Sequence, residues 1–129
     1  MGEERLRATA GLRGPINLSS WRGRSGRRYV VGVHPLTEPE LLDVADAVIV
    51  AVRRGRDGPA QVIDVAAIGG RWRERTRRCW VSLAREHGAN EMHVHRLAES
   101  ADERAAIAED LREGRTERVR PALWMSARE

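Results

Sequence analysis

The chain of 129 residues contains no lysine and no phenylalanine, and it has only one cysteine and one tyrosine. All 23 of its basic residues are therefore arginine, a uniform bias that we attribute to a G+C-rich coding sequence. The single cysteine, Cys79, cannot form an internal disulfide, which favours a reducing compartment. Its position among helical core residues predicts a small buried side chain.

Long hydrophobic runs are also missing. No stretch approaches the roughly 18 consecutive apolar residues of a membrane-spanning helix, so no membrane partner is expected. Residues 1–14 carry two glutamates and no apolar run of the kind found in secretory signals. We therefore expect a cytoplasmic protein. The length is sufficient for one domain with a modest core.

Positive charge is concentrated in two segments. Residues 1–28 hold seven arginines and two glutamates, giving +5, and residues 71–78 hold five arginines and one glutamate, giving +4. The remaining two segments are acidic, with −3 for residues 29–70 (three arginines, six acids) and −2 for residues 79–129 (eight arginines, ten acids). This distribution suits a polyanionic partner, and nucleic acid is the partner that we expect.

The apolar patterns predict one α/β (α+β) domain over residues 29–114. Residues 1–28 are expected to form a loosely ordered basic arm, and residues 115–129 a C-terminal tail. Within the domain we expect a small, mostly antiparallel central sheet of three or four strands with two principal helices packed on it. Strands are predicted at 27–36, 46–54, 60–69 and 91–97, a short helical turn at 39–46, and helices at 70–87 and 100–113. The Ser100–Glu103 capping box marks the start of the second long helix.

The first long helix is predicted to be amphipathic. Its expected buried face consists of Trp72, Thr76, Cys79, Trp80, Leu83 and Ala84. Four arginines at i, i+4, i+7 and i+14 are expected on the opposite face: Arg71, Arg75, Arg78 and Arg85. Guanidinium groups match phosphate oxygens, so these four predict a nucleic-acid-binding track, to which the arm would add Arg22, Arg24, Arg27 and Arg28. The alternative interpretation is an ordinary solvated face.

The element order from Asp46 to Gly114 resembles that of GIY-YIG nuclease domains, and the segment REHGANEMHVHRLAESADERAAIAEDL is similar to the helix–strand–helix of small bacterial members. The resemblance covers roughly residues 29–124. It would place the family's tyrosines at Ile49 and Val62, its metal-binding glutamate at Ala108 and its closing asparagine at Trp124. Arg71 would be the family's arginine.

Those substitutions imply a catalytically depleted domain. Phosphodiester cleavage of this kind needs an activated water and a metal held by a carboxylate, and alanine or aliphatic side chains provide neither. The resemblance therefore implies a non-enzymatic protein that has no cofactor and binds nucleic acid weakly. A motif shifted by one residue would make Glu109 the metal ligand of an active nuclease.

Two further possibilities remain open at this stage. A protein-interaction or regulatory module, including a homo-oligomer, would use an apolar patch formed by Leu41–Leu42 and Leu123–Trp124. His93 and His95 alternate along one strand, and with Cys79 or His34 they would form a metal site. The other interpretation of the two histidines is that they line a sheet face or cap the core.

Overall fold

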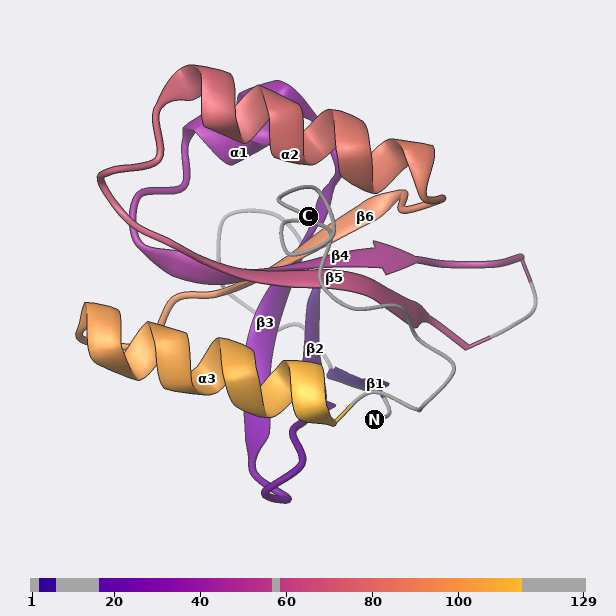
Figure 1. Cartoon of the computed structure of the whole chain (residues 1–129). Coiled ribbons are helices and arrows are strands. Elements are labelled where there is room, and N and C mark those ends of the chain that lie inside the picture. Colours follow the sequence, from indigo (N-terminus) through magenta and orange to yellow (C-terminus); the bar gives the residue numbers. More distant parts are fainter. Residues whose placement is uncertain (1–2, 7–16, 57–58, 115–129) are drawn as a thin grey trace, which may run out of the picture.

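The structure is a computed structural model that describes residues 3–6, 17–56 and 59–114. In these ranges, six strands and three helices follow one another as β1 (Glu3–Leu6), β2 (Leu18–Arg22), β3 (Arg28–Pro35), α1 (Glu38–Leu42), β4 (Ala47–Arg53), β5 (Gln61–Ile68), α2 (Glu74–Glu86), β6 (Glu91–His95) and α3 (Ala101–Glu113) (Figure 1). The predicted order strand–strand–helix–strand–helix is confirmed by β4, β5, α2, β6 and α3.

The described strands form one sheet in the order β1-β2-β3-β6-β4-β5, and every neighbouring pair is antiparallel. The predicted α/β class with a mostly antiparallel sheet is confirmed. The predicted strand number is too low, because six strands are present instead of three or four. The two additional strands, β1 and β2, come from the segment that was expected to be a loose arm.

The described part of that segment is built into the sheet. β2 pairs with β1 on one side and with β3 on the other. Trp21 on β2 is only 1% exposed and belongs to the core. The expectation of a loosely ordered arm is therefore wrong for residues 17–28, since a buried tryptophan fixes this segment. The predicted tail, residues 115–129, lies outside the described residues.

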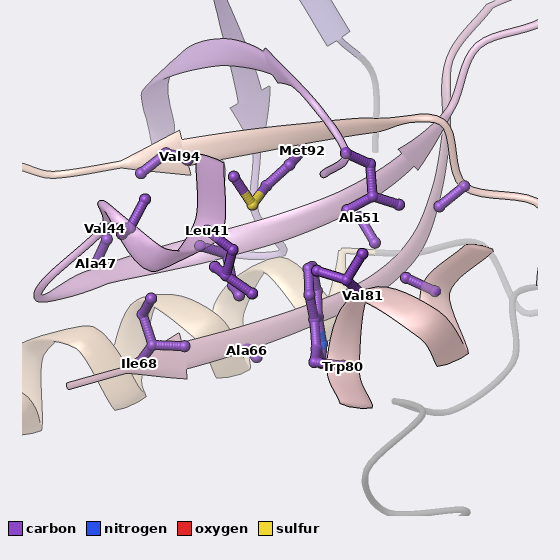
Figure 2. Close-up of a cluster of buried hydrophobic side chains, with 14 residues drawn as sticks. Leu41, Val44, Ala47, Ala51, Ala66, Ile68, Trp80, Val81, Met92 and Val94 are labelled. Carbon is purple, nitrogen blue, oxygen red and sulfur yellow. The ribbon is translucent and has the colours of Figure 1, made fainter. Parts of the chain in front are cut away.

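The sheet separates two hydrophobic clusters, with α1 and α2 on one face and α3 on the other (Figure 1). Successive residues of β4 alternate between the clusters, so Ile49 packs toward Trp80 of α2, whereas Val48 and Val50 pack toward α3. Figure 2 shows the first cluster, in which Trp80 and Val81 reach from α2 toward β5 and β4. The continuous apolar run of β4 is thus explained, because both of its faces are covered.

The buried face of α2 differs from the predicted one. Trp80 and Ala84 are buried as expected, but the other two buried residues are Arg77 and Val81. Cys79 is exposed, so its predicted burial is wrong. The helix begins at Glu74 and not at residue 70, which leaves Arg71 in the connection before it.

β5 lies at the edge of the sheet, although a continuous apolar run of this kind is typical of a central strand covered on both faces. One of its backbone carbonyls is occupied by α3, since Arg112 donates from Nε and Nη2 to the Val65 oxygen at 3.1 and 2.8 Å. Such side-chain contacts occupy groups that would otherwise be free to pair with another strand. Within the described ranges, no helix is both long and apolar enough to span a lipid bilayer.

Candidate nucleic-acid interface

The β2–β3 hairpin presents four of the predicted arginines to solvent. Arg22 pairs directly with Arg28 across the two strands, so both side chains project from the same face of the sheet. Arg24 and Arg27 lie in the connection between them, and all four residues are exposed. Like charges directly opposite each other destabilise a strand pair. The hairpin therefore brings guanidinium groups together on one face of the sheet.

Asp110 on α3 holds the hairpin in place. Its carboxylate accepts hydrogen bonds from the Ser25 backbone N–H (2.8 Å), the Ser25 hydroxyl (2.7 Å) and the Tyr29 hydroxyl (2.7 Å). The Arg24 backbone N–H donates to the Asp110 carbonyl at 3.1 Å. Burial alone would raise the pKa of Asp110, but the hydrogen bonds from Tyr29 and Ser25 outweigh it and lower the pKa. The basic hairpin is therefore positioned by α3 and does not hang free.

The backbone of the hairpin approaches the end of α3 closely, and this approach depends on glycine. A Cβ atom at Gly23 would lie 2.2 Å from Asp110 Oδ2, and one at Gly114 would lie 3.1 Å from the Arg22 carbonyl oxygen. Gly26 adopts a φ of 90°, which L side chains rarely tolerate. These glycines allow a tight turn to pack on the end of a helix.

The arginines of α2 and its preceding connection differ in their contacts. Arg78 forms ion pairs with Glu74 and Glu38, and Arg85 donates to the Leu36 carbonyl at 2.7 Å. The side chains of Arg71 and Arg75 are exposed and form no hydrogen bond or ion pair with any described residue. The predicted track therefore has fewer available arginines on the helical face. Arg71 lies outside the helix, and two glutamates partly compensate the charge of Arg78.

Arg77, also on α2, is directed inward, and its burial was not predicted from the sequence. Its Nε donates to the Trp72 carbonyl at 2.9 Å, and its Nη1 donates to the Leu41 carbonyl at 2.8 Å and to the Val44 carbonyl. Arg77 is 7% exposed. Its guanidinium thus joins α2 to the end of α1, and its charge adds little to the positive surface.

His93 belongs to a buried polar network that joins β6 to β2. Trp21 Nε1 donates to His93 Nδ1 at 2.8 Å, and His93 Nε2 lies 2.9 Å from Glu91 Oε1. Because Nδ1 accepts a hydrogen bond, the proton resides on Nε2 and the ring is neutral. Arg54 completes the network by contacting Glu91 at 2.9 Å and Glu3 at 2.6 Å. The hydrogen bonds that Arg54 donates to these two carboxylates raise its pKa.

The two histidines are buried side chains of the sheet, in agreement with the interpretation that they line a sheet face or cap the core. His95 Nδ1 lies 2.8 Å from the Val30 carbonyl oxygen, and the ring packs against Tyr29 at a centroid distance of 5.5 Å. Among the residues that the structure describes, no group of three or more histidine, cysteine, aspartate or glutamate side chains could hold a metal ion.

We expect the free energy of unfolding to fall as the pH decreases below about 6.5. Burial lowers the pKa of His93, so between the lowered value and 6.5 the unfolded chain binds a proton that the native chain does not. His34, whose pKa burial also lowers, contributes with the same sign. Below about pH 4.5 a second loss is expected, because contacts with Arg54 overcome the effect of burial and hold the pKa values of Glu3 and Glu91 below that value.

Urea unfolding of the His93→Gln variant between pH 7 and pH 5 tests the first part. Glutamine can accept from Trp21 and donate to Glu91 without titrating, so the pH dependence should become shallower. His87→Gln, at an exposed histidine, provides the comparison for the same exchange of side chains. An identical slope in the wild type and the His93→Gln variant would contradict the assignment.

The positions that the family resemblance implies for catalysis are divided between the two faces of the sheet. Ile49 is buried in the cluster on the α2 face, whereas Val62 and Ala108 are buried in the cluster on the α3 face. Glu109 is directed to solvent and lies 3.5 Å from Arg112. Trp124 lies outside the described residues. All three positions, Ile49, Val62 and Ala108, thus lie in the apolar core.

Comparison of the chain with models of protein families, with curated proteins and with solved structures gives no match in any of the three. The functional conclusion therefore depends on the residues and geometry described above.

Proposed function

We propose that this protein is a non-catalytic nucleic-acid-binding domain that contacts the phosphate backbone weakly and with little sequence preference. The observation that carries the proposal is the ordered basic hairpin, in which Arg22 and Arg28 stand opposite each other and Arg24 and Arg27 lie between them. Arg71 and Arg75 provide further exposed guanidinium groups. Guanidinium contacts to phosphate position a protein on nucleic acid but do not read base sequence.

The GIY-YIG-like part of the proposal is supported by the order β4–β5–α2–β6–α3 and by the strand order β6-β4-β5 within the larger sheet. Its non-catalytic part is supported by the buried apolar side chains of Ile49, Val62 and Ala108. A protein that kept this scaffold without proton-transferring or metal-binding groups would retain affinity for phosphodiesters but not cleave them.

The test is a salt-titrated binding assay with duplex DNA, single-stranded DNA and RNA. Each phosphate contact contributes about −0.9 to the slope of log K against log salt on duplex DNA. The Arg22→Ala/Arg28→Ala variant should therefore bind more weakly, and its slope should be shallower by about 2. Arg71→Ala/Arg75→Ala/Arg78→Ala tests the second set of arginines. Arg53→Ala/Arg56→Ala removes equal charge from exposed positions near the β4–β5 connection and serves as the control for the hairpin variant.

Three results would argue against this function. Absence of binding at low ionic strength would overturn it, and so would equal losses in the hairpin variant and its charge-matched control. Cleavage of plasmid, single-stranded DNA or RNA in magnesium or manganese, abolished by Glu109→Ala, would instead support an active nuclease with a shifted motif.

A protein-interaction module remains the second proposal, because Leu42 and Leu97 are 41% and 71% exposed. The predicted patch is altered, since Leu41 is fully buried and Leu123–Trp124 lie outside the described residues. A concentration-dependent oligomer in light scattering that Leu42→Ser or Leu97→Ser dissociates would favour this alternative.

A further inference from the structure

A cavity of about 380 Å³ lies where the end of β5 meets the first turn of α3. Residues 67–72 form one wall, and Ala101 and Arg104 on α3 form the other. Its volume lies within the range of small-molecule sites in proteins. Ala67, Ile68 and Trp72 make part of the lining apolar, so the cavity suits a ligand with an organic portion as well as a charge.

Two guanidinium groups line this cavity. Arg71 is exposed and forms no hydrogen bond or ion pair with another described residue. Arg104 is 13% exposed at its side chain, and its Nη2 lies 3.9 Å from Asp46 Oδ1, at the outer limit of an ion pair. The Asp46 side chain is 55% exposed, so solvent screens this pair. Both arginines therefore keep donors for a ligand.

The backbone around the cavity adds to its positive character. Ala101 is the first residue of α3, a helix of 13 residues, and a helix amino end carries partial positive charge. Two acids, Asp102 and Glu103, also lie in this first turn. Glu103 accepts a hydrogen bond from the Glu99 backbone N–H at 2.9 Å, and neither acid lines the cavity. A Cβ at Gly70 would meet no atom within 4 Å, so the wall is open at that point.

We infer that this cavity binds a phosphate monoester, either on a free nucleotide or at the end of a nucleic-acid chain. This inference rests on the proposed function and names a second, local ligand site for it. A monoester carries about −1.5 to −2 charges near neutral pH, more than a backbone diester, and therefore gains more from two guanidinium groups beside a helix amino end. The apolar wall accommodates the sugar or base.

Isothermal titration with adenosine 5′-monophosphate, adenosine and inorganic phosphate tests the site. We expect the monophosphate to bind at least tenfold more tightly than adenosine. Arg71→Gln and Arg104→Gln should each weaken its binding at least tenfold, which corresponds to about 1.4 kcal/mol. Arg73→Gln removes an equal charge from an exposed position near the cavity that is not part of its lining, and it should leave binding unchanged. Thermal unfolding of each variant establishes that it is folded, and the exposed Arg71 provides a test that does not depend on the contact with Asp46.

Equal binding of the monophosphate and adenosine, or full binding by both folded cavity variants, would overturn the inference. Duplexes with a 5′-phosphate or a 5′-hydroxyl then identify the source, because tighter binding of the phosphorylated duplex assigns the site to chain ends and equal binding assigns it to free nucleotide. The hairpin variant Arg22→Ala/Arg28→Ala separates the two proposals. If the hairpin variant loses duplex affinity while neither this variant nor the wild type binds the monophosphate, backbone binding stands and the cavity site does not.

Discussion

Arg77→Met is expected to lower the free energy of unfolding by about 2–4 kcal/mol, a large part of the roughly 5–15 kcal/mol that stabilises a typical domain. The substitution keeps much of the apolar stem but removes the donors that serve the carbonyls of Trp72, Leu41 and Val44. The Leu41 carbonyl keeps its bond from the Val44 N–H, so it contributes less to the cost. Buried carbonyls without donors carry the full penalty of desolvation.

Chemical denaturation of Arg77→Met beside Arg75→Met measures this effect. Both variants exchange an arginine for methionine on α2, but Arg75 is exposed, and its substitution should change stability by no more than about 0.5 kcal/mol. Equal losses in the two variants would show that Arg77 does not join α2 to α1 in the way described.

Asp110→Ala is expected to lower the free energy of unfolding by about 1–3 kcal/mol, because it removes three hydrogen bonds from a carboxylate that is partly exposed and therefore partly screened. It should also weaken nucleic-acid binding several-fold, since the hairpin would lose the contact that orders it. The variant gains one unit of positive charge. A purely electrostatic attraction would therefore predict the opposite sign for the change in affinity.

Glu109→Ala is the matched control, because it makes the same change in charge one residue away on α3. Its carboxylate contacts only Arg112 among the described residues and does not reach the hairpin. Amide hydrogen exchange at residues 22–28 should accelerate in Asp110→Ala and not in Glu109→Ala. Unchanged exchange together with tighter binding by both variants would remove the role assigned to Asp110.

The central elements could be predicted because their signals are local. The run 47–52 is apolar at every position, as a strand covered on both faces requires, and the Ser100–Glu103 box sets the start of α3, where the Ser100 hydroxyl accepts from the Glu103 N–H. The strands β1 and β2 were missed because their sequences, EERL and LSSWR, lack the regular apolar alternation by which a strand is recognised. Ser19 and Ser20 look like loop residues, yet Ser19 is buried beside Glu3 and is held by a hydrogen bond to it.

The candidate interface was predicted in its composition but not in its arrangement. Counting charges identified the arginines of residues 22–28, but it could not identify Asp110, more than 80 residues away, as the group that orders them. Helical periodicity could not separate Arg77 from Arg75 or Arg78 either. The buried side of α2 is set by the position of α1, since the carbonyls of Leu41 in α1 and of Val44 just after it lie within reach of residue 77.

The sequence by itself determined the α/β class, the order of the central strands and helices, and the two concentrations of arginine, since each depends on residue type and on spacing within one segment. Tertiary structure alone decided that the amino-terminal residues 17–28 join the sheet, that Cys79 is exposed while Arg77 is buried, and that Arg71 and Arg104 line one cavity. These outcomes depend on contacts between residues far apart in the chain, and the free energy of such contacts is fixed only when the sheet brings the segments together.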